Sequence, residues 1–491
     1  MLSKSQYIRG LQCHKSLWLY KHKPELRDKS DTEEESLFSA GNQVGDLAKR
    51  LFPNGVEIKF NSNDFDSMIL KTEELIENNT EVIYEASFKE NGIFAMADIL
   101  VKNGDAWDMY EVKGSTSIKE YHLDDAAIQW FSLSNAVKLN RAYIIHINNS
   151  YVRDGKLNLK ELFTIEDVTD RVLNRQDDIP LHLSQMNRIL QDNIPDIDIG
   201  THCSDPHSCD FWSHCWKHIP KPSVFNLYRM NGTKKFELYY KDIVSYNDLT
   251  THDVSLNQMQ KLQVETYQND TVTINKPIIK EFLDTIKYPI NFFDFETFQN
   301  AIPRFNNQRP YAQIPFQYSL HILHEDGTLE HKEFLGNENE DPRLALIKQM
   351  LDEITPTGSI VAYNQSFEIG RIKDLAAFAP QYSKELLALN ERFVDLIVPF
   401  RAKGYYHPAF NGSFSIKAVL PAMFPNNDEL NYKKLGSVQN GGDAMNTFAN
   451  LYLLKDISKR DEIRKDLLAY CRLDTLAMVR IWEKLHEIVQ V

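Results

Sequence analysis

The sequence predicts an α/β protein with two separate sheet-containing domains. Short runs rich in Val, Ile, Tyr and Phe lie between about 82 and 114, and a second group of such runs begins at 290. Helical stretches follow each group, which is the order expected of mixed sheets covered by helices. The length of 491 residues leaves room for two or three domains with sizeable cores.

Composition shifts along the chain suggest three parts. We expect a first domain over 1–220, a mostly helical connector over 221–285 and a second domain over 286–491. The connector begins near "HIPKPSVFNLY", where two prolines interrupt regular structure.

The overall composition is that of an ordinary globular protein, with 42% hydrophobic and 25% charged residues. The formal charge of −14 argues against a broad basic coat that binds nucleic acid without specificity. It leaves room for a nuclease, because acidic metal sites add to the negative count. The sequence has no apolar stretch long enough to span a bilayer and no secretory signal, so we expect a cytoplasmic protein without a membrane partner.

In the first domain, three strand-like runs are "EVIYEASF", "GIFAMADILV" and "AWDMYEVKG". The turn-forming residues "ENG" and "NGD" between them predict hairpins. A predicted helix, "YHLDDAAIQWFSLSNAVKL", and a strand, "RAYIIHI", follow, and helical text continues to about 195.

The hairpin carries the first candidate site. Glu111 and Lys113 are two residues apart, so they point to one face of a strand, and the preceding turn brings Asp98 alongside. Two carboxylates can hold Mg²⁺ or Mn²⁺, and a neighbouring lysine can orient the attacking water, which suits phosphodiester cleavage. Asp125 and Gln129 share one face of the following helix and could line the same cleft. The alternative is a surface hairpin with an ordinary Glu–Lys pair.

The segment "HCSDPHSCDFWSHCWKH" at 202–218 holds three of the five cysteines. With Cys13, the set Cys203, Cys209 and Cys215 provides the four thiolates of a closed metal site, and Cys471 lies far away in the sequence. Cytoplasmic cysteines stay reduced, so metal binding is more plausible than disulfides. Zinc, unliganded thiols and replacement of one cysteine by a nearby histidine stay open; those histidines are His202, His207, His214 and His218.

Residues 1–220 resemble the RecB-like nucleases of the PD-(D/E)xK superfamily that carry an iron–sulfur cluster, such as the CRISPR-associated RecB-like exonucleases and the AddB-type nucleases. In these proteins one cysteine precedes the nuclease core and three follow it. The resemblance implies a restriction-endonuclease-like fold and a 4Fe-4S cluster, with zinc as the alternative, held by Cys13, Cys203, Cys209 and Cys215.

The same resemblance implies that Asp98, Glu111 and Lys113 form the catalytic core. Glu85 falls where the family often has an acidic residue, and Gln129 falls at its helical glutamine position. Two departures are visible: the segment "SAGNQVGDLAKR" lacks the histidine that many relatives have, and the later cysteines are separated by five intervening residues rather than by the two of a CxxC pair.

The second candidate site begins in "INFFDFETF". Asp294 and Glu296 share one face of this predicted strand, and Phe293 and Phe295 face the other way. Two carboxylates in an apolar strand are costly to bury unless cations balance them. The alternative is an edge strand with both acids in water.

Two later segments add polar residues. In "GSIVAYNQSFEIGRI" a strand is followed by a helix that begins near Glu368. In "KDLLAYCRLDTLAMVRIW" Tyr470 and Asp474 are four residues apart, on one helix face. Taken singly, Tyr470 could be a core tyrosine and Asp474 a surface acid.

Residues 288–488 resemble the DnaQ-like (DEDDy) 3′–5′ exonucleases of the RNase H-like fold. Asp294 and Glu296 match their DxE motif, and Tyr470 and Asp474 match their YxxxD motif. The second motif of the family reads NxxFD, whereas "NQSFE" places Glu368 at that position. Asp395 and Lys417 lie in the regions of its DL-like and SLK-like stretches. The resemblance implies that the four carboxylates hold two Mg²⁺ or Mn²⁺ ions and that Tyr470 orients the attacking water.

Together, the two halves resemble an uncharacterised bacterial family that fuses both nucleases. We therefore expect a divalent-metal-dependent exodeoxyribonuclease that acts on single-stranded DNA or on free ends, in DNA repair or defence. Two alternatives stay open: an exoribonuclease that processes RNA, and a nucleic-acid-binding protein with degenerate metal sites. The sequence does not identify a protein partner.

Overall fold

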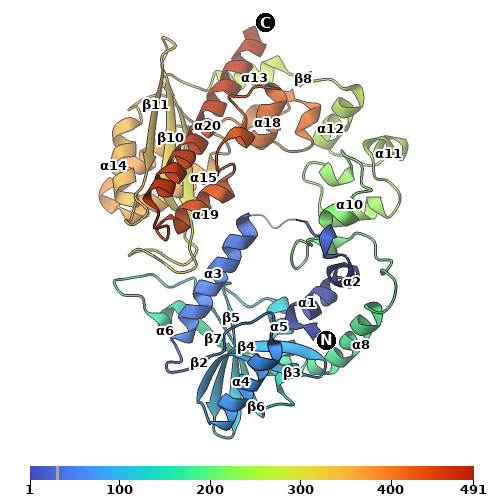
Figure 1. Ribbon diagram of the computed structural model, residues 1–491. Helices are drawn as coiled ribbons and strands as arrows, with labels where there is room; N and C mark the ends of the chain where they lie inside the picture. The colour runs from blue at the N-terminus through green and yellow to red at the C-terminus, as the bar shows by residue number, and fades with distance from the viewer. Residues whose placement is uncertain (29–31, 491) are drawn as a thin grey trace. The chain divides into compact units, whose positions relative to one another are not determined.

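The computed structural model describes residues 1–28 and 32–490, and the side chains of 32–40 lie outside the described part. The chain divides into two compact units (Figure 1). The first unit consists of Met1–His218 together with Asn300–Tyr311, and the second of Ile219–Gln299 and Ala312–Val491. Both units are mixed α/β, as the sequence predicted.

A sheet with the strand order β2-β3-β4-β5-β6-β7 is the centre of the first unit, and β1 pairs with β4 outside this path. Strands β3, β4 and β5 are antiparallel to one another, whereas β5 and β6 are parallel. The strands are β1 (Leu2–Ser3), β2 (Val56–Glu57), β3 (Val82–Glu90), β4 (Ile93–Asn103), β5 (Ala106–Lys113), β6 (Leu139–Ile147) and β7 (Phe163–Asp167).

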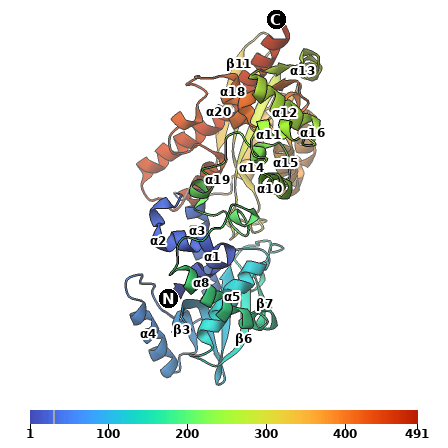
Figure 2. The same ribbon diagram turned by 90° about the vertical axis from the view of Figure 1, so that its right-hand side faces the viewer.

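Helix α5 (Glu120–Leu133) crosses this sheet and contacts β3, β4 and β6 (Figure 2). Its buried side chains, including Leu123 and Ile128, join the main apolar core of the unit with Met109 of β5. The other helices of the unit are α1 (Lys4–Gln12), α2 (His14–His22), α3 (Thr32–Lys49), α4 (Phe65–Glu77), α6 (Leu159–Leu162), α7 (Thr169–Leu173), α8 (Ile179–Ile189) and α9 (Trp212–Cys215).

The three hairpin strands are confirmed, but two predictions for the segment after them were wrong. The helix predicted to reach residue 139 ends at Leu133, because the residues from Leu139 onward pair with β5 as strand β6. The stretch up to 195 is not entirely helical, since Phe163–Asp167 adds strand β7 to the free edge of β6. Pairing with a distant strand overrode the local helical pattern in both cases.

The two ends of the first unit are joined by polar contacts. The Arg9 guanidinium on α1 donates to both carboxylate oxygens of Asp210, at 2.6 and 3.0 Å, and lies over the rings of Tyr20 and Phe211. The side chain of Gln12 donates to two backbone oxygens in the segment 202–207, at 2.8 and 2.7 Å. The segment that holds three cysteines is thereby fixed against the helices that flank Cys13.

Residues Asn300–Tyr311 belong to the first unit although they follow strand β9 in sequence. Arg153 donates from its guanidinium to the backbone oxygens of Pro303 and Arg304, both at 2.8 Å. The Tyr311 hydroxyl donates to the backbone oxygen of Gly114, directly after the candidate residue Lys113. The sequence pattern gave no indication of this association, because the contacts join residues that are about 150 to 200 positions apart.

The second unit is built on a sheet with the order β11-β10-β9-β12-β13. Its central strand β9 (Ile290–Phe298) is antiparallel to β10 (Ile314–Leu323) and parallel to β12 (Ile360–Ala362). The sheet is completed by β11 (Leu329–Leu335) and β13 (Phe393–Asp395), and β8 (Thr273–Ile274) pairs separately with β14 (Tyr405–Tyr406). Strand β9 covers the residues that the sequence predicted for it.

The two faces of strand β9 carry different side chains. Phe293 and Phe295 pack into a core with α14 (Arg343–Glu353), α15 (Ser366–Phe378) and α16 (Ser383–Asn390). Phe292 faces the opposite core, which includes α20 (Ile457–Gln490). Asp294 and Glu296 alternate with the phenylalanines, as predicted, and therefore lie on the α20 side of the sheet.

Helix α20 runs across β9 and β10 (Figure 1). Thr475 ties it to the sheet, because its hydroxyl lies 2.7 Å from that of Ser319 and 2.8 Å from Nδ1 of His321. The remaining helices are α10 (Gly232–Tyr239), α11 (Tyr246–Thr251), α12 (Gln258–Asn269), α13 (Lys276–Leu283), α17 (Val398–Arg401), α18 (Ile416–Met423) and α19 (Gly441–Leu451). The predicted connector over 221–285 is mostly helical and contains a small core around Tyr246 and Leu249.

No helix in the described part of the chain is long and apolar enough to cross a membrane.

The Arg9–Asp210 pair gives a prediction for stability. Both side chains are largely shielded, with 21% and 13% of their surfaces exposed, so Arg9→Met leaves the Asp210 carboxylate with fewer partners. We expect the first unit to lose about 2 kcal/mol of unfolding free energy in chemical denaturation. Arg188→Met is the control, because the pair with Asp192 is exposed and should contribute under about 0.5 kcal/mol. Equal losses in both variants would contradict the assigned role of Arg9.

Candidate active sites

Strands β4 and β5 bring together the first set of predicted residues. Asp98 lies one position beyond the end of this ladder, where Ile99 pairs with Tyr110, and the backbone N–H of Val112 donates to its carboxylate at 2.7 Å. Glu111 is buried, with 2% of its side chain exposed. Lys113 Nζ lies 2.7 Å from Oε1 of Glu111. The predicted hairpin site is therefore assembled, with Glu111 and Lys113 on one face.

Helix α5 adds two more side chains to the site. Gln129 donates to Oε2 of Glu111 at 2.5 Å and to the backbone oxygen of Met96 at 3.0 Å, which fixes the orientation of the carboxylate. The Asp125 carboxylate accepts a short hydrogen bond from Lys113. Both residues thus line the site, as their spacing on the helix suggested.

Glu85 enters from β3 through an unusual backbone conformation. Its φ of 57° lies in the left-handed region, and no pair is formed between Tyr84–Ile99 and Ala86–Ala97 in the β3–β4 ladder. Such conformations are uncommon for residues with a Cβ and cluster at functional sites. The Glu85 carboxylate lies 2.9 Å from Lys49 Nζ on α3, and its charge acts on both Asp98 and Glu111.

The close carboxylates shift the pKa values in this site. Burial, and then the charge of Asp98, raises the pKa of Glu111 to about 7. Burial also raises the pKa of Asp98, although Lys4 acts in the opposite direction. Burial disfavours the charge of Asp125 as well, yet Lys4 and Lys113 hold the pKa of this carboxyl well below its usual range. Separated pKa values of neighbouring carboxyls are typical of sites that bind metal or transfer protons.

The segment 39–50, which lacks the histidine of the RecB-like relatives, lies in helix α3. The side chains of residues 39 and 40 fall outside the described part. Lys49 from the end of this helix reaches Glu85, so α3 contributes a cation close to the carboxylates.

The four cysteines predicted as ligands line one cavity. Cys13 lies between α1 and α2, where it ends one helix and precedes the next. Cys203 is buried, and the other three are partly buried. Burial raises the pKa of the Cys215 thiol to about 11, while the charge of Lys15 acts in the opposite direction. A bound metal would lower the pKa of these thiols instead, since thiolates are stabilised by the metal that they ligate.

The spacing of the sulfurs bears on the kind of metal. A single tetrahedral zinc with Zn–S bonds of about 2.3 Å places its four sulfurs about 3.8 Å apart. Among the described residues, no three of these sulfurs all lie within 4.8 Å of one another. The four sulfurs are therefore not at the mutual distances of zinc ligands.

The second set of predicted residues gathers on the α20 side of strand β9. Glu296, Glu368, Tyr470 and Asp474 are buried, with 3–8% exposed, and Asp294 is partly buried. They come from three elements, β9, α15 and α20, that are far apart in sequence. The five predicted residues thus form one cluster, in which the charges of Asp474, Glu368 and Glu296 act on the pKa of Asp294.

Burial dominates the electrostatics of this cluster, and repulsion between carboxyls adds to it at Asp294 and Glu296. Burial, followed by the charges of Asp474 and Glu368, raises the pKa of Asp294 well above its usual range. Burial raises the pKa of Glu368 to about 8, and its Oε2 is buried without a hydrogen-bond partner. Burial raises the pKa of Asp474 to about 6, although hydrogen bonds from Tyr432 and Tyr470 and the charge of Lys417 act in the opposite direction. Carboxylates held in this way are suited to bind cations.

Tyr432 is a site residue that the sequence reasoning missed. Its hydroxyl donates to Oδ1 of Asp474 at 2.5 Å. Lys417 Nζ lies 5.4 Å from the ring centre of Tyr432 and 5.5 Å from that of Tyr470, so the lysine lies beside both rings. Tyr432 belongs to a single short turn in a loop, and no motif signals it in the sequence.

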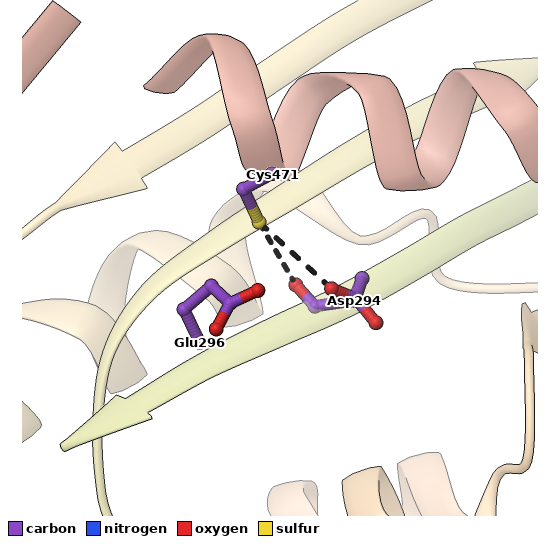
Figure 3. A group of neighbouring side chains, drawn as sticks. All are labelled: Asp294, Glu296 and Cys471. Carbon is purple, nitrogen blue, oxygen red and sulfur yellow. Dashed lines mark hydrogen bonds between the residues drawn. The ribbon is translucent and has the colours of Figure 1, made fainter. Parts of the chain in front are cut away.

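The predicted second site did not include Cys471. This cysteine is fully buried, and its sulfur lies 4.0 Å from Oδ2 of Asp294 (Figure 3). Asp294, Glu296 and Cys471 each offer a ligand atom, and these atoms all lie within 4.8 Å of one another. The position of Cys471 directly after Tyr470 in the sequence was the available signal for this contact, because neighbouring helix residues can reach the same strand.

Asp395, in the DL-like stretch, serves the backbone rather than the cluster. Its carboxylate accepts hydrogen bonds from the backbone N–H groups of Asn364 at 2.8 Å and Ile397 at 3.2 Å. Asn364 has a positive φ of 70°, so Asp395 stabilises the turn that precedes α15 and Glu368.

Comparisons with known proteins cover part of the chain. Residues 291–415 match a domain of unknown function, DUF2779. This region includes Asp294, Glu296 and Glu368 and ends before Tyr470 and Asp474.

Three curated proteins without a described function are also similar. "Uncharacterized protein UU173" of Ureaplasma parvum serovar 3 is 27% identical over 299 residues, or 55% of this chain and 42% of that protein. "Uncharacterized protein MG366" of Mycoplasma genitalium is 27% identical over 209 residues, and its Mycoplasma pneumoniae homolog is 29% identical over 212 residues; each match covers 39% of this chain and 31% of the relative. The aligned regions therefore span less than half of these relatives.

The uncompensated carboxylates of the second unit give a prediction for metal binding. Asp294→Asn removes a buried charge, so we expect the metal-free variant to gain about 1 kcal/mol in unfolding free energy. Wild-type protein should gain about 2.7 kcal/mol from Mn²⁺ at 100 times its Kd, and the variant should lose most of this gain. Denaturation of the second unit with and without Mn²⁺ measures both effects.

Asp352→Asn is the matched control, because Asp352 is exposed on α14. It should leave both quantities unchanged. An Asp294→Asn variant that keeps the full Mn²⁺ effect would show that this cluster does not bind the ion.

Proposed function

We propose that this protein hydrolyses phosphodiester bonds in DNA at two metal-dependent sites, one in each unit. The observation that carries the proposal is the convergence of Asp294, Glu296, Glu368 and Asp474, from three distant elements, around Tyr470. The burial of four carboxylates that repel one another would cost roughly several kcal/mol of folding free energy. A bound divalent ion offsets this cost. The order of the motifs along the chain agrees with a DnaQ-like exonuclease.

In the second unit, the roles follow from the positions of the side chains. The four carboxylates would hold divalent ions. When bound, these ions would stabilise the attacking water and the leaving oxygen. Tyr470 is in hydrogen-bond contact with Asp474 and would orient the water. Lys417, beside the rings of Tyr432 and Tyr470, supplies positive charge near the position of the phosphate.

In the first unit, Asp98 and Glu111 would hold one Mg²⁺ or Mn²⁺ ion. Gln129 fixes the Glu111 carboxylate through the hydrogen bond at 2.5 Å, so that its other oxygen stays available. Lys113 contacts that oxygen at 2.7 Å and would orient the attacking water and stabilise developing charge. These residues suit a PD-(D/E)xK nuclease that acts on single-stranded DNA or on free ends.

The cysteines fit a structural cluster. Cys13, Cys203, Cys209 and Cys215 provide an all-sulfur donor set that lines one cavity. We assign them to a 4Fe-4S cluster that joins the ends of the first unit. The cluster would stabilise the folded chain, and the chemistry would take place at Asp98, Glu111 and Lys113.

End-labelled oligonucleotides test the catalytic assignments. With Mg²⁺ or Mn²⁺, wild-type protein should shorten single-stranded DNA, and removal of the metal with a chelator should stop the reaction. Lys113→Ala and Asp294→Ala should each lower one of two activities at least about 100-fold, and the double variant should lose both.

Matched RNA oligonucleotides distinguish an exoribonuclease from a DNA enzyme. Tight DNA binding without cleavage in either metal would support the alternative of a binding protein with degenerate sites. If neither substitution changes any cleavage, both catalytic assignments are wrong.

Metal analysis tests the cluster. Protein purified without oxygen should absorb visible light and contain about four iron atoms per chain. Cys203→Ser should lose the iron and unfold the first unit more easily, by about 2–5 kcal/mol. Cys471→Ser is the control, because Cys471 lies in the second unit and should not affect the iron. A colourless protein that carries zinc would contradict the iron assignment and leave the structural role intact.

A further inference from the structure

The carboxylates of the first unit contact a second lysine besides Lys113. Lys4 Nζ lies 3.0 Å from Oε1 of Glu111 and 3.2 Å from Oδ2 of Asp125. Lys113 Nζ contacts the same two oxygens. Two ammonium groups thus flank one pair of oxygens, and Lys4 comes from the beginning of the chain, 109 positions before Lys113.

The backbone holds Lys4 in this position. Leu2 and Ser3 form strand β1, which pairs with Ile93 and Phe94 of β4, and Leu2 is buried. Ser3 then caps helix α1: its hydroxyl accepts from the N–H of Gln6 at 3.3 Å, and its own N–H donates to the Gln6 side chain at 3.2 Å. Lys4 is the first residue of this helix. An ordinary surface lysine needs no such support.

The exposure of the side chains distinguishes the two lysines. Lys4 has 26% of its side chain exposed, compared with 18% for Lys113 and 2% for Glu111. Lys4 therefore borders the solvent, from which a substrate arrives. Its flexible stem allows the ammonium group to exchange a carboxylate oxygen for a phosphate oxygen without movement of the backbone.

The charge balance gives Lys4 a role. Lys4 and Lys113 act on three carboxylates, Asp98, Glu111 and Asp125, which leaves one negative charge in excess when all are ionised. One divalent ion changes this to one excess positive charge, which a phosphodiester neutralises. Without Lys4, the site with one ion is neutral, and the phosphate adds an unbalanced negative charge.

We propose that Lys4 is a second substrate-binding lysine of the first unit, whose ammonium group donates to a non-bridging oxygen of the scissile phosphodiester. This inference rests on the proposed nuclease function. It adds a contact from the N-terminus of the chain to the residues that the hairpin and α5 provide. The phosphate oxygen would take the place of Glu111 Oε1 as the partner of Lys4.

Salt dependence of DNA binding tests this contact directly. Binding of a labelled single-stranded oligonucleotide is measured in Ca²⁺, with every protein in the Asp294→Asn background to silence the second unit. Lys4→Gln, which removes the charge and keeps a polar side chain, should weaken binding about 10-fold and lower the slope of log K against log salt by about 0.7. Lys4→Arg should restore the slope. Lys138→Ala is the control, since Lys138 is 67% exposed and paired with Asp105.

Cleavage in Mg²⁺ provides a second measurement. Lys4→Gln should lower kcat/KM, and Lys4→Arg should recover most of the loss, whereas a merely stabilising lysine would change the unfolding transition alone. If the wild-type protein binds and cleaves DNA, and Lys4→Gln has the same salt slope and the same kcat/KM, this inference alone is overturned. A parent protein that neither binds nor cleaves DNA overturns the proposed function of the first unit and this inference with it.

Discussion

Mutual repulsion among buried carboxylates is the constraint on which both units depend. Each unit places acidic side chains from distant elements close together in a poorly solvated site, where ionised groups are costly. The surrounding structure either supplies cations or leaves the charge uncompensated. The two units differ in how far cations balance the carboxylates, and this difference explains much of their architecture.

The first unit supplies its own cations. Lys113 comes from the same strand as Glu111, Lys4 comes from the start of α1, and Lys49 comes from the end of α3. The helices of the N-terminal segment are therefore part of the site rather than an appendage to it. Because Cys13 lies between α1 and α2, a metal held by the four cysteines would also fix the helix that begins with Lys4.

In the second unit, hydrogen-bond donors balance the carboxyls more than cations do. Tyr432 and Tyr470 bond to Asp474, and Lys417 and Arg371 act as cations on different carboxyls. The pKa values of Asp294 and Glu296 stay well above their usual range despite these partners. Helix α20 is held against this repulsion by the bonds of Thr475 to β10 and by the apolar residues on either side of Asp474. The stability of the sheet and helix thus maintains a site in which buried carboxyls stay close together.

The sequence was sufficient where one element carried the whole pattern. Strand β9 was predicted in full, and the alternation of Asp294 and Glu296 with phenylalanines placed the acids on one face. Lys4 and Tyr432 were missed because their partners lie more than 40 positions away, and no local spacing marks them. Strand β7 was missed for the same reason, since pairing with β6 determines its conformation.

Anomalous scattering from crystals soaked in Mn²⁺ tests the central claim most directly, because it locates the ions without reference to activity. The account predicts one peak between Asp98 and Glu111 and at least one peak among Asp294, Glu296, Glu368 and Asp474. Manganese bound elsewhere on the protein, with both carboxylate clusters empty, would contradict it.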